Sequence, residues 1–115
     1  MSSFVYGRRL LEFLLDFYFS GGMAGDYDTQ IVKIGGRNWG FEQLSAMRAD
    51  IVRAIEMLEL DEKIVVALRH SGHTFYEIRN TVRIRKIDVI NIYHGAIIRM
   101  LIYLNGPIDK DVPRN

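Results

Sequence analysis

The residues best suited to bind a ligand form a basic run from Arg79 to Lys86, which holds four cationic side chains and no acidic one. Guanidinium and ammonium groups bind phosphate oxygens through charge-assisted hydrogen bonds. Over the whole chain, 15 Lys and Arg residues nearly balance 14 Asp and Glu residues, so the formal net charge is only +1. The run therefore indicates a local anion-binding segment that the overall composition hides.

Other residue combinations give little indication of chemistry. The 115-residue chain has no cysteine, which excludes a disulfide scaffold, a Cys-ligated zinc and a thiol nucleophile. His70 and His73 have a spacing that can hold a metal on one helix, but Gly72 between them favours a helix end. Carboxylate pairs do not stand in a recognisable catalytic frame. We therefore expect neither an enzyme nor a metal or cofactor site.

The elements expected around the basic run are two short helices and a longer one, over about 61–71, 75–82 and 85–104. Thr74 and Glu77 have the spacing of a capping box, in which the threonine hydroxyl caps the middle helix and the glutamate reaches back. Gly106 and Pro107 end the long helix. Two short helices with a tight turn before a longer helix form a helix-turn-helix arrangement.

Upstream, the sequence predicts a helix, a glycine-rich segment and a second helix. Residues 4–19 are apolar except for charges about one turn apart, which predicts a core or interface helix with one polar edge, and neither a signal peptide nor a membrane span. Six of the ten glycines fall within 21–40, where we expect a loop or short hairpin. Over 41–58, a helical seam is expected to pack inside the domain, with a dimer seam as the alternative; its residues are Leu44, Met47, Ile51, Ala54 and Leu58.

These elements predict a mainly α fold in a single domain of residues 1–115. The N-terminal helix and the Gly-rich loop or hairpin occupy residues 1–40, and the helical module that ends in the helix-turn-helix occupies residues 41–106. Residues 107–115 form a tail that we expect to fray. Without cysteine or an export signal, a cytoplasmic setting is expected.

The long helix carries more apolar residues than one buried face requires. Its inner face runs from Val89 to Leu104, and a second apolar stripe lies beside it, formed by Ile87, Ile90, Ile98 and Ile102. A large exposed apolar patch usually marks an interface. We expect residues 4–19 to cover the stripe, with a partner subunit or RNA polymerase as the alternative.

The sequence GHTFYEIRNTVRI, residues 72–84, resembles the G-x-S/T-aromatic-x-E-I-A-x-x-L-G-I segment of bacterial sigma factor region 4. Val89 and the segment 94–97 fall near further residues of that module. The helix over 44–58 is similar to the one that precedes this module in RinA- and ArpU-type phage transcription regulators. The resemblance covers about 45 residues of the module, from Leu60 to Leu104, and implies a DNA-binding helix-turn-helix.

Three arginines depart from the sigma pattern. Arg79 stands where the family has alanine between the two helices, so we expect it to be crowded. Arg83 stands where glycine usually turns the chain with a positive φ, which predicts backbone strain there. Arg85 replaces the serine that usually caps the recognition helix, so that helix is expected to begin without a side-chain cap.

The resemblance implies a phage-type regulator in the host cytoplasm that contacts double-stranded promoter DNA, host RNA polymerase or both. A homodimer would fit palindromic half-sites. Base edges would then meet Arg85, Lys86, Asp88 and Asn91 near the start of the recognition helix. Phosphates would meet Thr74, Arg79 and Arg83.

Two alternatives remain open. A phage small terminase subunit would use the same helix-turn-helix to recognise packaging sites. A protein-interaction module that inhibits host RNA polymerase or sigma factor would instead present Ile87 and Ile90 to a protein, because these isoleucines stand where polar groups would face base edges.

Overall fold

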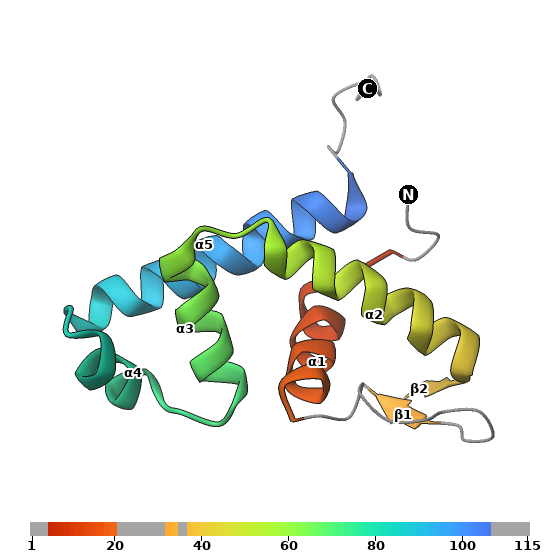
Figure 1. Ribbon diagram of the computed structural model, residues 1–115, viewed down its shortest axis with the longest axis horizontal. Helices are drawn as coiled ribbons and strands as arrows, with labels where there is room; N and C mark the ends of the chain where they lie inside the picture. The colour runs from red at the N-terminus through yellow and green to blue at the C-terminus, as the bar shows by residue number, and fades with distance from the viewer. Residues whose placement is uncertain (1–4, 21–31, 35–36, 107–115) are drawn as a thin grey trace.

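The computed structural model describes residues 5–20, 32–34 and 37–106, and it is mainly helical, as the sequence predicts (Figure 1). The elements in chain order are α1 (Arg8–Phe19), β1 (Val32–Ile34), β2 (Arg37–Trp39), α2 (Phe41–Glu56), α3 (Leu60–His70), α4 (Phe75–Val82) and α5 (Lys86–Asn105). The first helix begins four residues later than the expected start at residue 4, and the other helices lie within about two residues of their expected bounds.

Part of the glycine-rich segment forms a short antiparallel hairpin, in which Val32 of β1 pairs with Trp39 of β2. A hairpin was one of the two forms expected within 21–40. The rest of that segment, residues 21–31 and 35–36, lies outside the described residues, as does the predicted tail at 107–115.

The apolar seam of α2, which Leu58 continues just beyond the end of the helix, packs inside the domain. All five of its residues, Leu44, Met47, Ile51, Ala54 and Leu58, are at most 4% exposed. Because other parts of the same chain already cover them, the internal packing is confirmed and these residues do not form a dimer seam.

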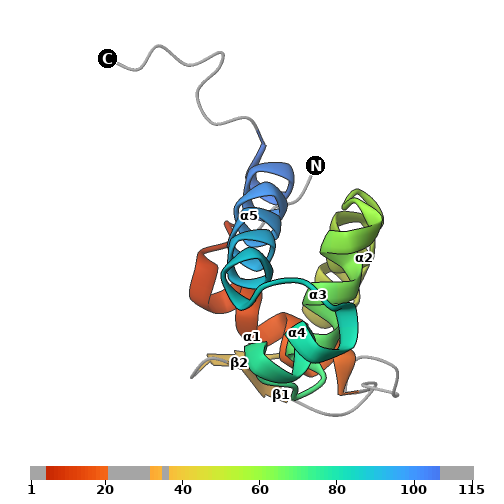
Figure 2. The same cartoon turned by 90° about the vertical axis from the view of Figure 1, so that its left-hand side faces the viewer.

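The long helix α5 is the centre of the core. Six residues of its predicted inner face are buried: Val89, Tyr93, Ala96, Ile97, Met100 and Leu104. The other two, Ile92 and Leu101, are half-buried against the same core, so the predicted face is confirmed. Helix α5 contacts each of the other described helices and crosses the molecule beside α2 (Figures 1 and 2). Among the described residues, α5 alone is long and apolar enough to cross a membrane, by length and composition only. A core helix passes the same test, and the buried face of α5 is that of a core helix.

The expected cover of the second stripe is wrong. Ile87, Ile98 and Ile102 are 53%, 52% and 50% exposed, and only Ile90 is half-buried. Helix α1 instead buries three of its four leucines in the core that it shares with α2, α3 and α5: Leu11, Leu14 and Leu15. Leucines one helical turn apart define a single apolar edge, and burying that edge directs α1 away from the stripe.

The chain just before α1 is tied to the end of α5. The backbone N–H of Tyr6 donates to Oδ1 of Asn105, and Nδ2 of Asn105 donates to the Tyr6 carbonyl, both at 2.8 Å. The Tyr6 hydroxyl also donates to Oδ2 of Asp50 on α2, at 2.8 Å. These bonds fix both ends of the described chain to the core.

Candidate nucleic-acid interface

A shallow basic hollow lies at the end of α4, on the turn that leads into α5. The hollow has a volume of about 490 Å³ and is lined by Arg79, Asn80, Arg83, Ile84 and Arg85. Three of these five residues are arginines and none is acidic. Three of the four cations of the expected basic run therefore line one concave surface, which suits an anion, whereas Lys86 lies outside its lining.

Local sequence chemistry fixes the start of α4. The N–H of Glu77 donates to Oγ1 of Thr74 at 3.1 Å, and the N–H of Thr74 donates to Oε1 of Glu77 at 2.9 Å. The predicted capping box is thus confirmed. Thr74 is exposed, but its oxygen already serves the helix end, so its principal role in this structure is to start α4.

Arg83 ends α4 in the left-handed conformation, with φ 63° and ψ 44°. The expected positive φ is confirmed, and Arg83 is the one non-glycine residue with this geometry among those described. This conformation costs an L-residue about 1–2 kcal/mol. The side chain is exposed and makes no hydrogen bond or ion pair within the described chain. The strain therefore positions an unpaired cation beside the hollow.

The expected crowding of Arg79 is wrong, because its side chain is exposed on the surface of α4. It donates from Nη1 to Oδ1 of Asn80 at 3.0 Å, and its guanidinium carbon lies 5.5 Å from the ring centroid of Tyr76. Neither the Asn80 amide nor the Tyr76 ring carries a negative charge, so the positive charge of Arg79 is not neutralised. The hollow thus has a second cation without an acidic partner.

Arg85 differs from the other two arginines because it is paired. Its Nε and Nη2 donate to the two carboxylate oxygens of Asp88 at 2.9 and 3.2 Å. This bidentate contact, first through its hydrogen bonds and then through its charge, raises the pKa of Arg85. Arg85 precedes α5 without a side-chain cap, as predicted. Arg85 and Asp88, two of the four residues expected to meet base edges, are thus bonded to each other. The other two, Lys86 and Asn91, are exposed.

The start of α5 is exposed as far as His94, where the first residue of α1 contacts the helix. Arg8, the first residue of α1, places Nη2 at 2.5 Å from Nδ1 of His94. Before His94, the outward face of α5 presents Ile87 and Asn91, one helical turn apart. The contact between Arg8 and His94 therefore separates the exposed first two turns of α5 from the exposed residues further along the helix, such as Ile98.

A polar network that centres on the buried His70 and Tyr93 and reaches two more exposed carboxylates on α1 was not predicted from the sequence. Nδ1 of His70 donates to Oδ1 of Asp16 at 2.6 Å, and Nε2 of His70 lies 2.8 Å from the Tyr93 hydroxyl. That hydroxyl donates its one proton to Oε2 of Glu12 at 2.9 Å. Burial, and then the hydrogen bond to Glu12, raise the pKa of Tyr93. The only sequence signal was the charged edge of α1, which contains both carboxylates.

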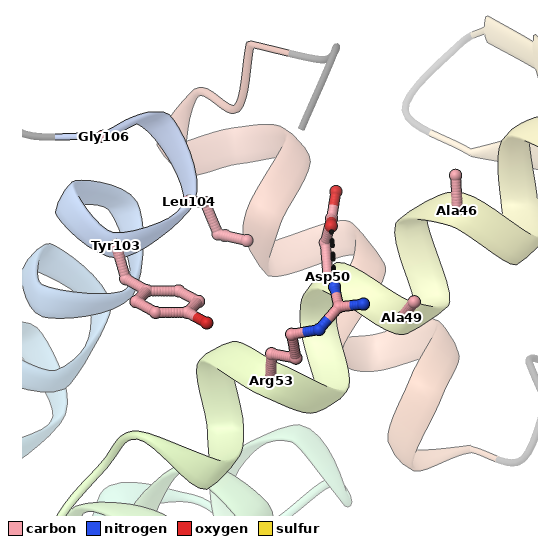
Figure 3. Close-up of a pocket in the computed structure, with 7 residues that line it drawn as sticks. All are labelled: Ala46, Ala49, Asp50, Arg53, Tyr103, Leu104 and Gly106. Carbon is pink, nitrogen blue, oxygen red and sulfur yellow. Dashed lines mark hydrogen bonds and ion pairs between the residues drawn. The ribbon is translucent and has the colours of Figure 1, made fainter. Parts of the chain in front are cut away.

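A second cavity, of about 430 Å³, lies between α2 and the end of α5 (Figure 3). Its charged residues are already engaged. Asp50 accepts the Tyr6 hydroxyl at 2.8 Å, and Nη1 of Arg53 lies 3.5 Å from the other Asp50 oxygen. The remaining lining is small or apolar except for Tyr103: Ala46, Ala49, Leu104 and Gly106. This cavity has no uncompensated charge to hold an anion, in contrast to the hollow at the turn.

In the part of the chain that the structure describes, there is no group of three or more His, Cys, Asp or Glu side chains placed to hold a metal ion. The chemistry that the hollow offers is anion binding by the guanidinium groups of Arg79 and Arg83. Comparison of the chain with protein-family models, with curated proteins and with solved structures gives no match.

Proposed function

We propose that the protein binds double-stranded DNA and acts as a phage-type transcription regulator. In this proposal α4, the turn at Arg83 and α5 form a helix-turn-helix, and the start of α5 enters the major groove. The observation that carries the proposal is the basic hollow, in which Arg79 and Arg83 lack any acidic partner within the described chain. The role in transcription rests on the resemblance to sigma region 4.

Phosphate binding at the hollow would position the protein on the duplex. Phosphate contacts fix the register and orientation of a DNA-binding protein without reading sequence. Arg79 and Arg83 lie at the end of α4, directly before α5, so a phosphate held there lies beside the start of α5. An α-helix about 10–12 Å wide fits a major groove about 12 Å wide. The first two turns of α5 lie next to the hollow and present exposed residues, so they are the part that would enter.

A mobility-shift assay with a mixed-sequence duplex at low salt tests the proposal. We expect micromolar or tighter binding that weakens steeply as salt is added, because phosphate contacts release counterions. The variant Arg79→Ala/Arg83→Ala should weaken binding strongly. Arg48→Ala/Arg53→Ala is a matched control, since it removes the same charge from exposed positions on α2. No shift at low salt, or equal losses in both variants, contradicts the proposal.

A further double variant tests how the ion pair between Arg85 and Asp88 affects DNA binding. Arg85→Ala/Lys86→Ala removes two cations at the start of α5 and also leaves the Asp88 carboxylate without its partner. An unpaired carboxylate repels phosphate, so this variant should lose more affinity than Arg79→Ala/Arg83→Ala. Adding Asp88→Ala should restore part of that loss, whereas an unchanged affinity would place α5 away from the DNA.

A second candidate function, contact with RNA polymerase, is favoured by one observation. Ile98 and Ile102 are about half exposed, at 52% and 50%, and they lie beyond the surface that would meet DNA. A direct binding measurement with purified host RNA polymerase tests this candidate. Binding that Ile98→Ser/Ile102→Ser abolishes, while DNA affinity is kept, supports it; equal binding by both forms contradicts it.

A further inference from the structure

The accessible face at the start of α5 combines one apolar and one amide side chain. Ile87 and Asn91 are four residues apart, so they project from the same side of the helix. Ile87 is 53% exposed, and Asn91 is exposed with no hydrogen bond from its side-chain amide to any described residue. An uncovered isoleucine beside an unused amide is a surface that can distinguish base pairs, because apolar groups and amides recognise different features of the major groove.

We propose that this face reads A·T base pairs, an inference that rests on the proposed DNA binding. Ile87 contacts the C5-methyl group of a thymine. The Asn91 amide accepts a hydrogen bond from N6 of an adenine and donates one to N7. Thymine alone presents a methyl group in the major groove, which an apolar side chain can contact. Adenine presents one donor and one acceptor there, which match the carbonyl and the NH2 group of an asparagine amide.

The charged residues at the start of α5 do not favour guanine. Arginine reads guanine by donating two hydrogen bonds to O6 and N7. Arg85 already donates from Nε and Nη2 to Asp88, so it would have to give up that contact first. Lys86 remains exposed and is equally suited to a phosphate.

The length of the accessible surface limits what can be read. Arg8 lies against His94, so the readable residues run from Lys86 to Asn91. At a rise of 1.5 Å per residue this segment is about 9 Å long. That length corresponds to about three base pairs at 3.4 Å each. One subunit therefore reads a short A·T-containing step.

Four alternating 20-base-pair duplexes test the inference by direct titration of the full chain. They contain A·T, A·U, I·C or G·C pairs only. Uracil lacks the thymine methyl group, and the I·C pair combines an A·T-like minor groove with a G·C-like major groove. We expect the A·T duplex to bind about fourfold more tightly than A·U, because uracil offers no methyl group for Ile87 to bury. It should bind at least about tenfold more tightly than I·C or G·C.

Variants assign each contact to its residue. Ile87→Ala should abolish the difference between A·T and A·U, and Asn91→Ala should reduce the difference between A·U and I·C. Ile98→Ala, an equally exposed isoleucine beyond His94, should leave every ratio unchanged. Circular dichroism confirms that each variant is folded, which is expected because both residues are on the surface.

The outcomes separate this inference from the function on which it rests. If all four duplexes bind with equal affinity, A·T reading is overturned and DNA binding stands. If the A·T and I·C duplexes bind equally and both exceed G·C, recognition lies in the minor groove and the inference is also overturned. If no duplex binds at low salt, the proposed function fails together with the inference.

Discussion

The Tyr93 hydroxyl lies 2.8 Å from Nε2 of His70, which joins the middle of α5 to the end of α3. Both side chains are buried, with Tyr93 4% exposed and the His70 side chain 5% exposed. Each also contacts a carboxylate on α1, Tyr93 through Glu12 and His70 through Asp16. One polar network therefore holds three helices together directly behind the surface proposed to meet DNA.

Removing the hydroxyl should weaken this junction. Tyr93→Phe removes the hydrogen bond to Glu12 and leaves Nε2 of His70 without its partner. We expect the free energy of unfolding to fall by about 1–3 kcal/mol, measured by urea denaturation. Tyr103→Phe is the matched control, because Tyr103 is 46% exposed. Equal midpoints for the two variants would show that the network contributes nothing to stability.

Alkaline pH should destabilise the protein through the same residue. Burial raises the pKa of Tyr93 above its ordinary value of 10.0, so the unfolded chain releases this proton first. The stabilising contribution is complete below pH 10, and it is lost as the pH rises toward the folded-state pKa. Melting temperatures between about pH 8 and pH 11 should therefore fall more steeply for the wild type than for Tyr93→Phe. Parallel slopes would contradict this assignment.

Removing the backbone strain at Arg83 should raise the stability of the fold and lower its affinity for DNA. Arg83→Gly removes the cost of a left-handed side chain, although glycine gains entropy in the unfolded chain. The free energy of unfolding should rise by about 0.5–1 kcal/mol in urea titrations. DNA affinity should fall, because the variant has no cation at this position beside the hollow. A variant that is both less stable and equally tight in binding would refute the role given to Arg83.

Helix positions could be predicted because their signals are local. The Thr74–Glu77 capping box and the 3,4-spaced apolar seam of α2 specify hydrogen bonds and a buried face within a few residues. The positive φ at Arg83 was also predictable, because the resemblance to sigma region 4 aligns this residue with a glycine that turns the chain.

Contacts between distant segments could not be predicted in this way. Asp16 and His70 are 54 residues apart, and no spacing rule relates them. The same limit explains the wrong expectation for the second stripe, because periodicity shows that Ile98 and Ile102 share a face without showing what faces them. Within the candidate site, the run of cations was visible in the sequence, but the pairing of Arg85 with Asp88 required side-chain geometry.

The salt dependence of DNA affinity tests the central claim most directly. Fluorescence anisotropy with a labelled mixed-sequence duplex gives the slope of log Kd against log salt concentration, which reports the number of neutralised phosphates. We predict that Arg79→Ala/Arg83→Ala reduces this slope by about two, because each of the two arginines neutralises one phosphate. Arg48→Ala/Arg53→Ala should leave the slope unchanged. No binding by the wild type at low salt, or the same slope in all three proteins, would contradict DNA binding through the basic hollow.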